Sequence, residues 1–169
     1  MKKIEALEVF ADAIGIEIRY ANLHKINERL EGIAYADAGL IVLSDTLKNN
    51  HRLHKCVLAE EIGHIINPPK PGHIRYHLTS YWQLDFYEQS NIRITVAQDE
   101  RKALDWATSV LIPNVDFCPM IVKPLYTVGE LAEYFEVEPW FVHLKISYYR
   151  CKEREVGRKA KWRDMIKRR

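Results

Sequence analysis

The chain has 169 residues, the length of one domain with a small appendage. Its 47% hydrophobic and 28% charged residues are ordinary for a globular protein and exclude a disordered chain, and no apolar run approaches the length of a membrane-spanning helix. The formal net charge of +2 is unevenly distributed, because residues 151–169 sum to +6 and residues 1–150 to −4.

The cysteines and the first residues predict a cytoplasmic protein. Cys56, Cys118 and Cys151 are odd in number and far apart, so they predict neither a disulfide framework nor a zinc knuckle. Two acids, Glu5 and Glu8, stand where a signal peptide would have its apolar core, and export is therefore not expected.

The first part of the chain predicts a helix followed by a small sheet. Apolar residues recur at helical spacing over residues 4–14 and end at Gly15, a helix terminator. Residues 16–20 alternate as a half-buried strand does, and residues 32–36 and 40–43 predict a strand pair joined by a short turn. The expected fold class is α+β, with a small, mostly antiparallel sheet packed on a helical zincin-like core and a C-terminal helix pair.

A long helix is expected next, capped by Ser44 or Asp45 and ended by the proline-rich stretch after Ile66. At about 100° per residue its apolar side chains form one broad arc. The arc consists of Leu47, Leu53, Val57, Leu58, Ile62 and Ile65. Glu61 projects near its middle, and a buried carboxylate implies a cation, a hydrogen-bond network or a metal nearby.

Other positions of this helix predict its surroundings. Ala59 and Gly63 lie on the side away from the arc, where small residues let another backbone approach, so the helix is expected to be enclosed. His51 and His54 are expected at the surface near its start. Cys56, four residues before Glu60, is expected to be a small buried hydrophobic residue rather than a ligand.

Glu60 and His64 are four residues apart and can converge on one point. In the H-E-x-x-H helix of zinc hydrolases, residues i and i+4 bind the metal and the acid at i+1 accepts a proton from water. Here Glu60 replaces the first His, and a carboxylate and an imidazole at this spacing can still share a metal. The alternative is a buried Glu-Glu-His cluster that only forms hydrogen bonds.

A second predicted helix, over residues 100–113, also places an acid in an apolar stripe. The stripe consists of Ala103, Leu104, Trp106, Ala107, Val110 and Leu111. Glu100 lies inside it, and a cation shared between the two helices explains both buried acids. Glu60, His64 and Glu100 would then provide three ligands and leave one position open for water, which is the catalytic pattern.

The stretch between residues 68 and 98 is rich in aromatic residues and has no clear periodicity. Loops that line a site often have this composition. Tyr76 or His77 could stabilise the oxyanion of a peptide-bond intermediate. The alternative is that these rings are exposed or form structural hydrogen bonds.

After Pro113 a connector is expected through Pro124, and beyond it the sequence predicts a helix pair with the outline of a helix-turn-helix. Thr127 and Glu130 form a capping-box pattern, and Pro139 occupies the first position of the next helix. That second helix is mostly apolar and surrounded by glutamates, so direct DNA binding is not predicted, and packing or a protein partner is the better interpretation. The basic tail, residues 151–169, favours nucleic acid, with a solvated helix end as the alternative.

With these residues in view, the chain resembles the ImmA/IrrE family of metallopeptidases, particularly the short members encoded by phages and integrative elements. Three stretches match in the family's order, LAEEIGHII, ERKALDWATSVLIP and VGELAEYFEVEPWFVHLKI, within roughly residues 30–148. The departure is Glu60, where much of the family has His. The resemblance implies that Glu61 is the general base and that His64 and Glu100, with Glu60, are metal ligands.

The resemblance also implies a function and a domain organisation. The function would be a metal-dependent endopeptidase, holding one divalent metal, zinc or else manganese or another metal, that cleaves a cognate helix-turn-helix repressor and relieves repression of mobile-element genes. The alternative is a non-proteolytic anti-repressor that sequesters its partner, because Glu60 makes the ligand set harder and more anionic. The expected organisation is a metallopeptidase-like domain, a helix-turn-helix-like appendage and a basic tail, over residues 1–126, 127–150 and 151–169.

Overall fold

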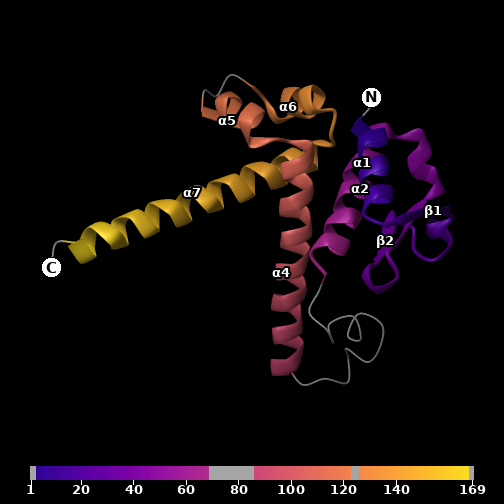
Figure 1. The fold of residues 1–169 in the computed structure, drawn as a ribbon, viewed down its shortest axis with the longest axis horizontal. Helices are drawn as coiled ribbons and strands as arrows, with labels where there is room; N and C mark the ends of the chain where they lie inside the picture. Colours follow the sequence, from indigo (N-terminus) through magenta and orange to yellow (C-terminus); the bar gives the residue numbers. More distant parts are fainter. Residues whose placement is uncertain (1–2, 69–85, 123–125, 168–169) are drawn as a thin grey trace.

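The computed structural model describes the chain over residues 3–68, 86–122 and 126–167, and the side chains over residues 4–68, 98–121 and 126–153. Helices and strands follow in the order α1 (Lys3–Ala13), β1 (Glu17–Ala21), β2 (Gly32–Tyr35), β3 (Leu40–Ser44), α2 (His51–Ile66), α4 (Phe86–Leu111), α5 (Asn114–Val122), α6 (Val128–Phe135) and α7 (Pro139–Lys167) (Figure 1). The predicted α+β class is confirmed, while the zincin-like core stays a prediction. In the described ranges no helix combines the length and the apolar character needed to cross a membrane.

The sheet is mixed, and not mostly antiparallel as expected. Its strand order is β1-β3-β2, in which β2 pairs antiparallel with β3 while β1 runs parallel to β3. The hairpin of β2 and β3 was readable because its strands are neighbours in sequence. The parallel pairing of β1 with β3 could not be predicted in the same way, because the two strands are separated in the sequence by β2.

Helix α2 is the central element, in contact with α1, with the sheet and with α4 (Figure 1). It begins later than predicted, because Asn50, and not Ser44 or Asp45, is its N-cap, with the side-chain oxygen accepting from the Leu53 N–H at 3.1 Å. Leu47 of the predicted arc lies in a separate 3-10 helix, Asp45–Asn49.

The start of α2 is more buried than the sequence indicated. His54 was expected at the surface but is 6% exposed, and its Nε2 lies 3.0 Å from the hydroxyl oxygen of Tyr20 on β1. Burial also lowers the pKa of His54. Helical spacing alone could not show that β1 covers this turn.

The enclosure of α2 is confirmed at Gly63. A Cβ atom at this position would lie 2.5 Å from the backbone oxygen of Ala103, so the backbones of α2 and α4 are in direct contact. On α4, Ala103 and Ala107 are fully buried, whereas Val110, which the stripe placed inward, is 42% exposed. The two helices therefore pack through small residues, which lets side chains of α2 and α4 near this contact reach one another.

The C-terminal helices join the same core as α2. Thr127 and Glu130 form both bonds of the predicted capping box at α6, and α7 begins at Pro139 as predicted. Helix α5, in contrast, occupies a stretch expected to be a connector, and its Phe117 is fully buried with its ring 6.4 Å from that of Phe135. The domain boundary at residue 126 stays a prediction.

Two neighbouring residues of α2 hold the turn between α6 and α7. The buried Lys55 donates from Nζ to the backbone oxygen of Phe135 at 3.2 Å, at the C-terminal end of α6. The Sγ atom of Cys56 accepts from the Glu138 N–H at 3.4 Å. The helix pair is thus bound to α2 by polar contacts as well as by apolar packing.

Replacing Lys55 by Met is expected to lower the free energy of unfolding by about 1 to 3 kcal/mol, because a buried carbonyl loses a donor while the space stays filled. Urea denaturation measures this difference. Lys25→Met, at an exposed lysine, is the matched control, with an expected change within about 0.5 kcal/mol. An equal effect of both substitutions would show that the bond of Lys55 to Phe135 and its ion pair with Glu136 at 3.7 Å contribute nothing.

Candidate metal centre

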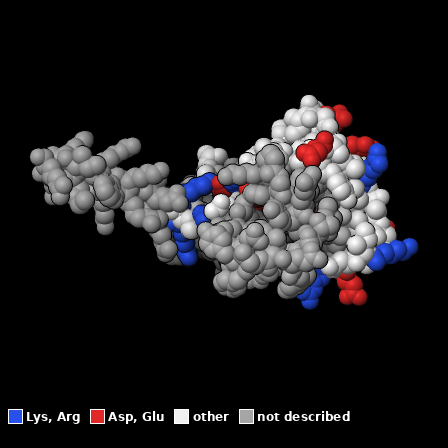
Figure 2. Space-filling view, turned by 90° about the horizontal axis from the view of Figure 1, so that it is seen from below, with Lys and Arg blue, Asp and Glu red and all other residues white. Residues whose placement is uncertain are grey.

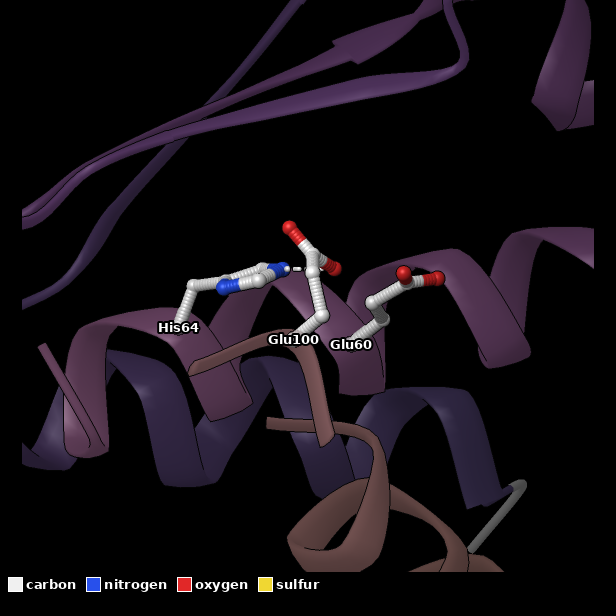
Figure 3. Close-up of side chains that lie close together, drawn as sticks. All are labelled: Glu60, His64 and Glu100. Carbon is white, nitrogen blue, oxygen red and sulfur yellow. Dashed lines mark ion pairs between the residues drawn. The ribbon is translucent and has the colours of Figure 1, made fainter. Parts of the chain in front are cut away.

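Three side chains with metal-binding atoms meet between α2 and α4. Glu60 and His64 project from successive turns of α2, and Glu100 reaches the same place from α4 (Figure 3). One ligand atom from each lies within 4.8 Å of the others, the one such group of three found in the described part of the chain. His64 Nε2 and Glu100 Oε2 lie 3.4 Å apart and form an ion pair when the imidazole is protonated. The structure therefore brings together the three residues that the sequence singled out.

Helix packing explains why Glu100 arrives at this point. Gly63 precedes His64 and touches the backbone at Ala103, which follows Glu100 by one helical turn. The absence of a side chain at Gly63 lets α4 approach closely enough for Glu100 to meet the imidazole. The site thus depends on a contact between backbones as well as on its own side chains.

The site is partly enclosed, and burial acts on its acids. The pKa of Glu60 is raised by burial and by the charge of Glu100, against the opposing effect of His64. Glu61, which is 9% exposed, has its pKa raised to about 7, mainly by burial and also by the charges of Glu60 and Glu100.

The imidazole responds in the opposite sense. Burial lowers the pKa of His64, but the hydrogen bond and charge of Glu100, together with the charges of Glu61 and Glu60, outweigh it and raise the pKa. Three carboxyl groups thus crowd around one imidazole in a partly dehydrated space. Positive charge is favoured at such a place, and a divalent cation would supply it.

The donor set fits a metal with little adjustment. In a tetrahedral zinc site with bonds near 2.1 Å, neighbouring ligand atoms lie about 3.4 Å apart. The separation of His64 Nε2 and Glu100 Oε2 already has this value. The Glu60 carboxylate lies to one side of that pair (Figure 3), and a side-chain rotation would bring it in. With an exposed fraction of 46%, the Glu100 side chain leaves the centre open on one side.

Cys56 does not belong to this centre. It is fully buried, and burial raises the pKa of its thiol to about 12. It therefore stays a protonated, buried side chain, as the sequence indicated. The two aromatic candidates for oxyanion stabilisation, Tyr76 and His77, lie outside the described residues.

Sequence reasoning missed one residue beside the site, Tyr148 on α7. Burial raises its pKa, Arg101 opposes this, and the charges of Asp105, Glu60 and Glu100 add to it, so Tyr148 lies within electrostatic reach of two of the three candidate ligands. The guanidinium of Arg101 sits 5.6 Å from the centre of its ring. No local signal reveals this, because α7 meets α4 only in the folded chain.

Tyr148 also lines a shallow cleft of about 270 Å³ between α4 and α7. The cleft is lined by Gln98, Arg101, Lys102, Asp105, Tyr148 and Lys152. Figure 2 shows Lys and Arg side chains, with acidic ones among them, where α7 leaves the rest of the molecule. Lys152 contacts both carboxylate oxygens of Asp105 at 2.8 Å, so part of this positive charge is neutralised.

Comparison with known proteins adds a family to this geometry. The family described as the IrrE N-terminal-like domain, peptidase M78, matches residues 11–147, which include the end of α1, the sheet, both ligand-bearing helices and the start of α7. No curated protein and no solved structure matches the chain. The matched segment covers almost all of the region, roughly residues 30–148, over which the sequence resembles the ImmA/IrrE family, and it begins about 20 residues earlier. The chain therefore belongs to the peptidase M78 family of IrrE-like metallopeptidases.

Proposed function

We propose that the protein is a metal-dependent endopeptidase whose metal is held by Glu60, His64 and Glu100 and whose general base is Glu61. The observation that carries this proposal is the convergence of three donors from two helices beside a buried carboxyl group. A bound divalent metal would supply Lewis acidity, which lowers the pKa of water and polarises a peptide carbonyl. Membership of a metallopeptidase family supports the same chemistry.

Glu61 would handle the protons of the reaction. A carboxyl group with a pKa of about 7 is an effective acceptor and donor near neutral pH. It would accept the proton of the attacking water while the C–O bond forms, and return it to the amine nitrogen as the C–N bond breaks. The products are a free carboxyl group and a free amine, so protons and bonds balance.

The geometry of β2 supports a peptide as substrate. In the strand order β1-β3-β2, strand β2 is at an edge, and it contacts α2. Because the Ser44 N–H donates to the oxygen of Glu31 at 2.8 Å, alternation along this antiparallel pair directs the N–H and C=O groups of Gly32 and Ala34 away from β3. An extended segment of another chain can pair with such an edge.

The proposed substrate is a cognate helix-turn-helix repressor, whose cleavage would relieve repression of mobile-element genes. The choice follows the resemblance to the ImmA/IrrE family, and the family match over residues 11–147 agrees with that resemblance. The proposed metal is zinc. Manganese or another divalent ion is the alternative, because two carboxylates beside one imidazole form a harder donor set than two imidazoles do. The cytoplasm is the proposed compartment, in keeping with three free cysteines.

A second candidate function is sequestration of the repressor without cleavage. Glu60 favours it, because this carboxylate stands where much of the family has an imidazole and makes the donor set harder and more anionic. Direct DNA binding is not part of either proposal. In the first turns of α7, Phe141 and Val142 are buried, which removes them from any surface that could read bases.

Metal removal separates the two candidates. Elemental analysis of the purified protein is expected to find about one divalent metal per chain, and incubation with the repressor is expected to yield two fragments. A chelator should abolish cleavage, and added zinc or manganese should restore it. The His64→Ala variant, deprived of the imidazole donor, should contain no stoichiometric metal. A metal-loaded protein that binds the repressor but leaves it intact would reject the peptidase and favour sequestration.

A further inference from the structure

The Glu61 carboxyl group lies against the backbone of β2. A Cβ atom placed on Gly32 would lie 2.6 Å from Glu61 Oε1 and 2.8 Å from Glu61 Cγ. It would also lie 2.9 Å from Val57 Cγ1, one turn earlier on α2. Distances under 3.0 Å essentially never occur for real Cβ atoms, so the Glu61 side chain occupies the space that a side chain at position 32 would fill.

This arrangement is particular to Gly32. At Gly129 on α6 the nearest atom to a Cβ would be Thr127 Oγ1 at 3.8 Å, an ordinary contact. At Gly63 the neighbour is backbone of α4, which serves helix packing. Gly32 alone among the glycines of the described residues meets a side chain to which the proposed reaction assigns a chemical step.

A glutamate side chain has three torsions, and a base must point in one direction to act. The space beside Gly32 that holds the Glu61 carboxyl group is bordered by Val57 of α2 and by the bare backbone of the sheet at Gly32. The carboxyl group thus lies in a narrow slot beside the metal centre, and Glu61 as a whole residue is 9% exposed. A methyl group at position 32 would turn the carboxyl group out of this slot.

We propose that Gly32 is a positioning residue for the general base: the missing side chain on edge strand β2 creates the slot that orients the Glu61 carboxyl group. This inference rests on the proposed role of Glu61. The three metal ligands do not impose this requirement for glycine, because the atoms closest to a Cβ at position 32 belong to Glu61 and Val57. The function of the helix motif therefore depends on one residue of the sheet.

The proposal is tested first without any substrate, by a thermal double-mutant cycle. Gly32→Ala is expected to lower Tm by about 3 to 10 °C in the otherwise unchanged protein. In a Glu61→Ala background most of this loss should disappear, because the side chain that clashes is gone, whereas in Glu61→Gln, which has the same size, it should persist. Gly129→Ala is the matched control and should leave Tm almost unchanged.

A variant that fails to fold also gives an answer. If Gly32→Ala alone is unfolded, recovery of folding in the Gly32→Ala, Glu61→Ala double variant supports the slot. An equal loss of Tm in all three backgrounds, or loss of folding in both single and double variants, would overturn it, since the clash would then lie with Val57 or the backbone.

The second test measures metal and kinetics on the folded variant. Gly32→Ala is expected to bind zinc as tightly as the unchanged protein, to keep KM for the repressor, and to lose about 10- to 100-fold in kcat. If Gly32 had only a structural role, Gly32→Ala would reduce zinc affinity together with Tm, or it would leave kcat unchanged. Either result would overturn the proposal. If the unchanged protein cleaves nothing, the proposed function fails, while the thermal cycle still decides whether Gly32 forms the slot.

Discussion

Replacing Glu61 by Gln is expected to reduce kcat for repressor cleavage by about 10²- to 10⁴-fold, the contribution that general acid-base catalysis typically makes. The amide has the size of the carboxyl group but can neither accept nor return the proton. Zinc content should stay at about one per chain, because Glu61 is not among the three converging donors. Single-turnover kinetics and elemental analysis measure the two quantities. Unchanged cleavage would reject Glu61 as the base.

The same substitution should change the pH dependence of stability in the metal-free protein. The carboxyl pKa of Glu61 is raised from 4.5 to about 7, so the folded state holds a proton that the unfolded state releases in this window. The stabilisation is complete below pH 4.5 and is lost as the pH rises through 7. Gln cannot ionise, and Glu61→Gln is therefore expected to gain Tm relative to the unchanged protein above pH 7. A Tm difference that does not vary with pH would contradict the raised pKa.

Replacing Gly63 by Ala is expected to reduce both stability and metal affinity. The added Cβ would lie 2.5 Å from the Ala103 oxygen, 0.9 Å short of the 3.4 Å at which such contacts become ordinary. Because the obstacle is backbone, α2 and α4 must separate, and this costs about 1 to 3 kcal/mol although Ala is the better helix former by about 1 kcal/mol. His64 and Glu100 flank this contact and move apart with it, which should weaken zinc binding by about 10- to 100-fold.

Urea denaturation and competition with a chromophoric chelator measure these two effects. Gly129→Ala again provides the comparison, since that glycine has open space around it and should change neither quantity. If Gly63→Ala retained full zinc affinity, the centre would not depend on the close approach of the two helices.

The candidate centre could be predicted because acidic residues interrupt the apolar stripes of the two helices that form it. Glu61 and Glu100 each interrupt an apolar stripe, and an acid expected to be buried demands a partner. That rule connected two acids 39 residues apart in the sequence without any knowledge of the fold. In the structure Glu61 is buried, whereas the Glu100 side chain is 46% exposed. The capping box at Thr127 and the Pro139 start were equally readable, because their signals lie within four residues.

Other features had no local signal. A connector was expected from Pro113 through Pro124, yet most of this stretch forms α5, which contains Pro119 and whose Phe117 is fully buried. Tertiary packing overrode the local preference there. The approach of β1 to His54, the contact of Gly32 with Glu61, and the position of Tyr148 likewise arise between segments that only the fold brings together.

The bonds from Lys55 and Cys56 to the turn between α6 and α7 bear on protein engineering. Both residues belong to the same helix as Glu60, which lies about 6 to 7.5 Å further along the axis. That distance is too short for a helix to bend and absorb a disturbance. Exchanging the last two helices for those of a relative, in order to redirect the protein to another target, would therefore transmit any misfit directly to the first ligand. Successful chimeras should carry α2 and its helix pair as one unit.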